Sequence, residues 1–162
     1  MAHQTYRLSF LSLLGPLLSA LVLNLLLTHS CRGHSQLIGP SRSILAGIGD
    51  DIILPCHLKP VMNINAETIE WTRPDLKERF VHVRRPGLDL VNVQNPSYKG
   101  RTSLFPHELK QGNISLKLSK VQLSDQGTYV CDIPVLNKNS SIRLVVGKLT
   151  HSVTDVDVGN II

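Results

Sequence analysis

Two cysteines and a tryptophan are the most informative side chains in this 162-residue chain. Cys56 and Cys131 are far apart in the sequence, and Trp71 lies between them. In an oxidising compartment two such thiols form a disulfide bridge, and an indole ring can pack against it. A bridge that is covered in this way is poorly accessible to other thiols, so we expect it to be structural rather than redox-active.

The sequence offers little support for a metal site or a catalytic site. The chain has seven histidines, but His57, His82, His107 and His151 show no ligand spacing with Cys, Asp or Glu. No nucleophile-elbow motif, zinc-protease motif or phosphate-binding glycine loop is present. We therefore expect no enzyme activity, no metal, no cofactor and no small-molecule substrate.

The charge of the chain also argues against nucleic acid as a partner. Lys and Arg number 17 and Asp and Glu number 12, which gives a formal net charge of +5. Loss of Arg7 and Arg32 with an N-terminal leader would lower that net charge to +3. The basic residues are interspersed with acidic ones, whereas nucleic-acid binding requires a concentrated basic face.

The N-terminus has the composition of a secretory signal peptide. Residues 8–27 are apolar, rich in Leu and free of charge. Cleavage after Ser30 or after Ser35 is plausible, and cleavage after Ser35 also removes Cys31 and leaves an even number of cysteines. We therefore predict a signal peptide over residues 1–35, with an uncleaved membrane anchor as the alternative because the apolar stretch is long enough to span a bilayer.

Beyond the leader, apolar and polar residues alternate in short runs separated by turn-forming residues, which is typical of antiparallel strands. The expected strands include residues 52–58, 69–71, 80–84, 101–105, 114–118, 129–133 and 142–146. With the cysteines, Trp71, and Tyr129 two positions before Cys131, they predict an all-β immunoglobulin variable-type (V-set) β-sandwich with Greek-key connections and one inter-sheet disulfide. The long segment between Trp71 and Arg101 favours the variable type over the constant type.

We place the domain at residues 36–147 and interpret residues 148–162 as a flexible tail or a truncated junction. Tyr129 is expected to fix a corner of the fold, because its hydroxyl can bond to the backbone near Asp125. Arg101 and Asp125 are candidates for an ion pair, although the sequence alone does not show that they meet.

Two sequons predict N-glycosylation. They are Asn113-Ile114-Ser115 and Asn139-Ser140-Ser141. If Ile114 faces the core, Asn113 points outward, and Asn139 is expected in an exposed turn before the last strand.

Recognition of a protein partner remains as the function. The sheet that contains the Trp71 and Cys131 strands should expose one broad face. The candidate partner-binding residues there are Glu70, Thr72, His82, Arg84, Val130, Asp132 and Arg143. In the loop after Cys131, Val135 and Leu136 either contact the partner or fold back over the end of the sandwich.

Several segments make the prediction more specific. Residues 53–58 (Ile-Leu-Pro-Cys-His-Leu) and 66–71 (Ala-Glu-Thr-Ile-Glu-Trp) resemble strands of the butyrophilin family, as do residues 94–102 and 123–131. The resemblance runs from about residue 36 to residue 147. It implies that Arg101 and Asp125 form the ion pair of variable-type domains.

The same resemblance implies a non-catalytic protein on the external side of the plasma membrane. Such a protein binds a counter-receptor on lymphocytes and regulates T-cell activation and cytokine production. Members of the family usually continue into a constant-type domain and a membrane helix, and no such segment follows Ile162 in this sequence. A secreted form, a decoy of such a ligand and an incomplete gene model are therefore alternatives.

Two further expectations remain open beside a co-signalling ligand. One is a homophilic or heterophilic adhesion protein that binds another immunoglobulin-domain protein. The other is a weak homodimer.

Overall fold

A computed structural model of the chain describes Ser19 and residues 35–147. The predicted signal peptide, apart from Ser19 and Ser35, and the predicted tail at residues 148–162 lie outside the described residues. All elements below belong to the compact unit that begins at Ser35.

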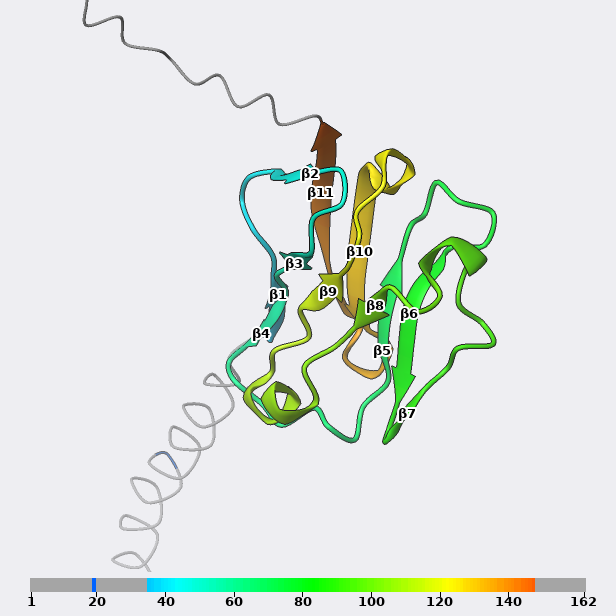
Figure 1. Cartoon of the computed structure of the whole chain (residues 1–162). Helices are drawn as coiled ribbons and strands as arrows, with labels where there is room; N and C mark the ends of the chain where they lie inside the picture. The colour runs from blue at the N-terminus through cyan, green and yellow to red at the C-terminus, as the bar shows by residue number, and fades with distance from the viewer. Residues whose placement is uncertain (1–18, 20–34, 148–162) are drawn as a thin grey trace, which may run out of the picture. The chain divides into compact units, whose positions relative to one another are not determined.

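Two layers of β-sheet pack face to face, which confirms the all-β variable-type sandwich (Figure 1). One layer is a six-stranded sheet in the order β2-β11-β10-β5-β6-β7. Its strands are β2 (Ile44–Gly47), β11 (Lys138–Gly147), β10 (Gly127–Ile133), β5 (Ile69–Thr72), β6 (Phe80–Arg85) and β7 (Leu88–Asp89).

The second layer contains the strand pair β1-β4 and the three-stranded sheet β3-β9-β8. These strands are β1 (Gln36–Ile38), β4 (His57–Lys59), β3 (Ile52–Leu54), β9 (Leu116–Leu118) and β8 (Thr102–Ser103). Short 3-10 helices lie in the connections: η1 (Pro96–Tyr98), η2 (Pro106–Gln111), η3 (Leu123–Asp125) and η4 (Pro134–Leu136).

Strands that are distant in the sequence are neighbours in the six-stranded sheet. β2 pairs in parallel with β11, while β10 pairs antiparallel with both β11 and β5. The chain therefore crosses repeatedly between the layers, as the Greek-key connections of a variable-type sandwich require.

The core between the layers is built around one covalent link. The predicted disulfide joins Cys56 to Cys131 across a sequence separation of 75 residues. Trp71 lies opposite Cys131 in the strand register and is fully buried. Its indole Nε1 donates a hydrogen bond of 2.9 Å to the carbonyl oxygen of Ile114 in the other layer, so its one polar atom is satisfied.

The expected strand at residues 52–58 is interrupted in its middle. Pro55 has no N–H to contribute to the ladder, and β3 and β4 lie on either side of it. The backbone N–H of Cys56 donates to the Ser115 hydroxyl instead, at 3.0 Å. This contact explains why Ser115 is buried, although strict alternation with Ile114 and Leu116 predicts that it faces solvent.

Arg101 and Asp125 meet next to the corner at which β10 begins. Two guanidinium nitrogens of Arg101 contact the two carboxylate oxygens of Asp125, each at 2.8 Å. The Tyr129 hydroxyl donates to the Asp125 carbonyl oxygen at 2.7 Å. The bidentate ion pair and the tyrosine bond together hold η3 against the start of β10.

A second arginine, Arg73, lies behind this corner, and no sequence pattern predicts its burial. Arg73 is only 3% exposed, and its Nη1 donates to the Tyr98 hydroxyl at 2.9 Å and to the Asp125 carbonyl at 3.1 Å. Its Nη2 lies 2.6 Å from the carboxylate of Asp75, which raises the pKa of the Arg73 guanidinium above its usual value. The guanidinium also stands 5.3 Å from the Tyr129 ring centroid, in cation–π geometry.

The disulfide makes a large contribution to stability. Replacement of both half-cystines, Cys56→Ala with Cys131→Ala, should lower the free energy of unfolding by about 4–5 kcal/mol, because a cross-link over so long a loop restricts the unfolded chain. Urea unfolding of the purified domain measures the loss. A double variant that unfolds at the same urea concentration as the wild type would contradict this assignment.

Gly127 is required by the close approach of Arg73. A Cβ atom at position 127 would lie 2.6 Å from the guanidinium carbon, and a shift of the guanidinium would weaken its hydrogen bonds to Tyr98 and Asp75. Gly127→Ala should therefore destabilise the domain by about 1–3 kcal/mol in urea unfolding. Gly147→Ala is the matched control, because nothing lies within 4 Å of a Cβ there; equal effects of the two substitutions would refute the steric argument.

Candidate protein-binding face

The outward side of the six-stranded sheet is organised by β10. Tyr129, Cys131 and Ile133 point into the core, so the residues between them point away from it. The strand register extends this surface sideways, since Val130 lies opposite Thr72 of β5 and Ser141 of β11. We define the outer face by its half-buried or exposed residues Glu70, Thr72, Phe80, Thr128, Val130, Asp132, Asn139, Ser141 and Arg143.

One end of the outer face is acidic. Asp132 lies directly opposite Glu70, which places two like charges side by side across the strands. Neither carboxylate has an ion-pair partner within the described part of the chain. Burial raises the pKa of the Asp132 carboxyl, so its charged form is incompletely solvated. A cationic group from a partner would reduce the repulsion between Glu70 and Asp132 and would also stabilise the charged form of Asp132.

The other end of the outer face is basic. Arg143 lies opposite Thr128 and is exposed, and it too has no ion pair among residues 35–147. A shallow hollow of about 410 Å³ opens beside it, lined by Pro74, Asp75, Gly127, Thr128, Val130, Ser141 and Arg143. An acidic side chain of a partner would fit here, because it would find an uncompensated guanidinium and two hydroxyl groups.

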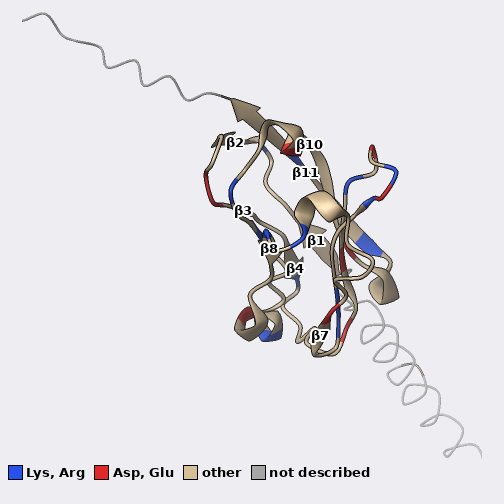
Figure 2. Cartoon of the chain, turned by 45° about the vertical axis from the view of Figure 1, so that its right-hand side comes forward, with Lys and Arg blue, Asp and Glu red and all other residues tan. Residues whose placement is uncertain are grey.

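Between the two ends, the middle row of the outer face is less polar. It runs from Ser141 through Val130 and Thr72 to Phe80. Over residues 35–147, acidic and basic residues are dispersed among the strands and loops (Figure 2). An uncharged centre with charged ends is consistent with a moderate-sized protein–protein interface, because the core of such an interface is depleted of charged residues.

The two apolar side chains of the loop after β10 lie in different environments. Val135 is 69% exposed in η4. Leu136 is half-buried and packs against the core. Leu136 therefore folds back over the sandwich, whereas Val135 is exposed and its contact with a partner stays a prediction.

His82 and Arg84 do not belong to the outer face, and the prediction that they point outward is wrong. A β-bulge between Trp71 and Thr72 leaves one extra residue in β6, so Val81 and His82 both point inward. An extra residue reverses the direction of every side chain that follows it. Arg84 consequently lies opposite the buried Ile69, on the inner side of the sheet.

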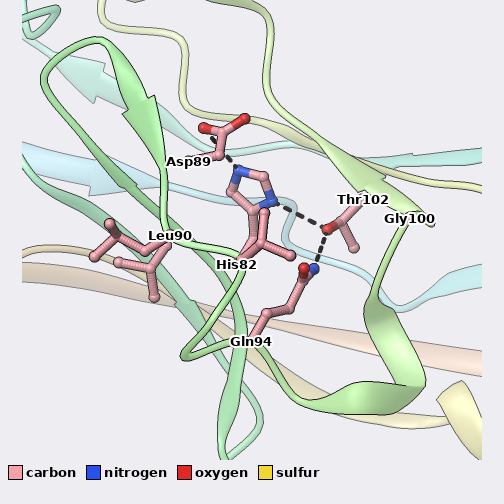
Figure 3. Close-up of a pocket in the computed structure, with 8 residues that line it drawn as sticks. His82, Asp89, Leu90, Gln94, Gly100 and Thr102 are labelled. Carbon is pink, nitrogen blue, oxygen red and sulfur yellow. Dashed lines mark hydrogen bonds and ion pairs between the residues drawn. The ribbon is translucent and has the colours of Figure 1, made fainter.

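The reversed histidine occupies a small polar hollow between β6 and β8 (Figure 3). His82 is 5% exposed, and its Nδ1 lies 3.0 Å from the Thr102 hydroxyl, which also accepts a 2.7 Å hydrogen bond from Gln94. The other ring nitrogen, Nε2, has no hydrogen-bond partner among the described residues and lies 3.5 Å from an Asp89 oxygen. Burial lowers the pKa of His82, although Asp89 opposes this shift, and the hollow measures about 250 Å³.

The two sequons lie on different layers. Asn113 is half-buried beside β4, where its Oδ1 accepts from the Ser115 hydroxyl and its Nδ2 donates to Glu108. Asn139 is exposed and lies within β11, opposite Asp132, rather than in the turn before the strand. Glycosylation of either residue stays a prediction.

Other kinds of site are not found in the described region. Residues 35–147 contain no group of three or more His, Cys, Asp or Glu side chains placed to hold a metal ion. No helix in the same region has the length and hydropathy to cross a membrane.

Comparisons with known proteins agree with this geometry. The family model for the immunoglobulin V-set domain matches residues 39–148. Myelin-oligodendrocyte glycoprotein of Pongo abelii is 37% identical over 120 residues, which cover 74% of this chain and 48% of that protein. V-set domain-containing T-cell activation inhibitor 1 of Rattus norvegicus is 32% identical over 111 residues, which cover 68% of this chain and 39% of that protein.

A solved structure of bovine butyrophilin superposes with a TM-score of 0.64 at 28% sequence identity, over 71% of this chain and 55% of that one. The chain spans about half the length of the relatives it matches, or somewhat less.

The buried His82 should make stability depend on pH. Its pKa in the folded domain lies below the usual 6.5, so the unfolded chain binds a proton first as the pH falls, and stability drops below about pH 6.5. His82→Gln, whose amide can still contact Thr102, should lose less stability between pH 7.5 and pH 5.5 than the wild type. Urea unfolding at both pH values measures this difference, and parallel losses in the two proteins would contradict it.

Proposed function

The chain belongs to the immunoglobulin V-set family, of the butyrophilin and myelin-oligodendrocyte glycoprotein type, and from this membership we propose that it is a ligand for a lymphocyte receptor. Proteins of this type are non-enzymatic receptors or ligands, so binding is the activity to explain. The outer face binds the receptor, and this contact regulates T-cell activation and cytokine production.

The uncompensated charge on the outer face is the observation that carries this proposal. Glu70 and Asp132 at one end and Arg143 at the other have no ion-pair partners within residues 35–147. On the outward side of the second layer, by contrast, two opposite charges do meet, since Lys117 lies 3.1 Å from Asp51. A receptor with a basic group and an acidic group at matching positions would gain both affinity and orientation from the unpaired residues.

The relatives and the disulfide support an extracellular location for this function. One relative is named as an inhibitor of T-cell activation, and a solved neighbour is a butyrophilin. A buried disulfide such as Cys56–Cys131 forms in the oxidising secretory pathway, which agrees with a signal peptide over residues 1–35. We therefore place the domain outside the cell.

Adhesion between like molecules is the second candidate, and a specific feature favours it. The outer face carries opposite charges at its two ends, so two copies with antiparallel strands would place Arg143 of one near Asp132 of the other. The same contact would explain a weak homodimer.

Staining of cells with fluorescent multimers of residues 36–147 distinguishes these functions. We expect staining of T cells that do not express the protein. Asp132→Ala and Arg143→Ala should each weaken it about fivefold or more, because each leaves an opposite charge of the receptor unpaired at the interface, which costs about 1 kcal/mol or more.

Asp51→Ala and Lys117→Ala are the matched controls, since they remove the same charges from the other layer. These variants should stain as the wild type does and be secreted at equal levels. Staining confined to cells that express the protein would instead support adhesion, and equal losses in all four variants would contradict a role for the outer face.

A further inference from the structure

The second sequon lies within the surface proposed to bind the receptor. Asn139 is an exposed residue of β11, and the register places it opposite Asp132, which in turn lies opposite Glu70. The three residues form one row across the acidic end of the outer face. Ser141, the hydroxyl residue of the sequon, lies on the same face opposite Val130.

The Asn139 amide is available for modification. Its side chain makes no hydrogen bond to any residue in the described part of the chain. The Asn113 amide differs, because both of its ends are hydrogen-bonded and it lies beside β4 in the other layer. Only at Asn139 would attached carbohydrate project from the outer face.

We propose that an N-linked glycan on Asn139 covers the acidic end of the outer face and limits receptor binding. This inference rests on the proposed function and adds its regulation. In the attachment step, Asn139 Nδ2 forms a bond to the anomeric carbon of an oligosaccharide carried by a lipid pyrophosphate. The carbon–oxygen bond to the pyrophosphate breaks, the lipid pyrophosphate leaves and Nδ2 gives up one proton to a base.

The glycan would limit receptor binding because of its size and its position. A branched oligosaccharide is several times larger than any side chain, and it is attached one strand away from Asp132 and two strands away from Glu70. A receptor that approaches these carboxylates must displace or avoid it. Molecules that carry the glycan and molecules that lack it would therefore bind with different affinities, so occupancy of the sequon sets the strength of the signal.

The test uses two substitutions that remove the sequon through different residues, Asn139→Gln and Ser141→Ala. Ser140→Ala is the control, because it keeps the sequon and the position lies opposite Cys131 on the inward side of β11. Each chain is expressed in mammalian secretory cells, glycan occupancy at position 139 is measured by peptide mass spectrometry, and T cells are stained with equal amounts of multimer.

We expect occupancy of Asn139 in the wild type and in Ser140→Ala, with equal staining. Both sequon-removing variants should stain about three- to tenfold more strongly, which corresponds to roughly 0.7–1.4 kcal/mol. An unoccupied Asn139, or an occupied one whose removal leaves staining unchanged, would overturn the inference while the proposed function stands.

If no variant stains T cells, coverage of the outer face by the glycan can still be measured without a receptor. Glu70→Cys is introduced with and without Asn139→Gln, and the rate of reaction with a bulky maleimide reagent is measured. Faster labelling without the glycan supports coverage of the face even if the proposed function fails. Equal rates would overturn the inference.

Discussion

The alternation of side chains along β10 determines where the functional surface of this domain lies. Cys131 is tied to Cys56 in the opposite layer, so its side chain must point inward. Tyr129 and Ile133 share that direction and are fully buried. Val130 and Asp132 are therefore forced outward, and the register of β5 and β11 aligns their neighbours on the same surface. A single covalent constraint in the core thus sets the outer face.

The fold could be predicted from the sequence because short local patterns and one pair of cysteines identify it. The two cysteines, Trp71 and the alternating segments around them are sufficient for the variable-type sandwich. Glu70, Thr72, Val130, Asp132 and Arg143 were also assigned to the outer face correctly, since they lie on strands whose alternation is regular.

The sequence-based predictions are wrong where the position of a side chain depends on strand pairing or on long-range contacts, which the sequence of a single strand does not reveal. His82 and Arg84 are turned inward by a bulge that depends on the pairing of β5 with β6. Arg73 could not be recognised as a buried cation, because its partners Tyr98 and Asp125 come from segments far along the chain. Asn139 was assigned to a turn, and only its pairing with Asp132 places it on the outer face.

Site-specific photocrosslinking shows whether the receptor contacts the outer face. A benzophenone amino acid is placed at Val130 on the outer face or at Ile53, which is 52% exposed on the outward side of the other layer. Each purified protein is irradiated on T cells. We expect a crosslinked T-cell protein from position 130 and none from position 53. Crosslinking from position 53 alone would contradict it.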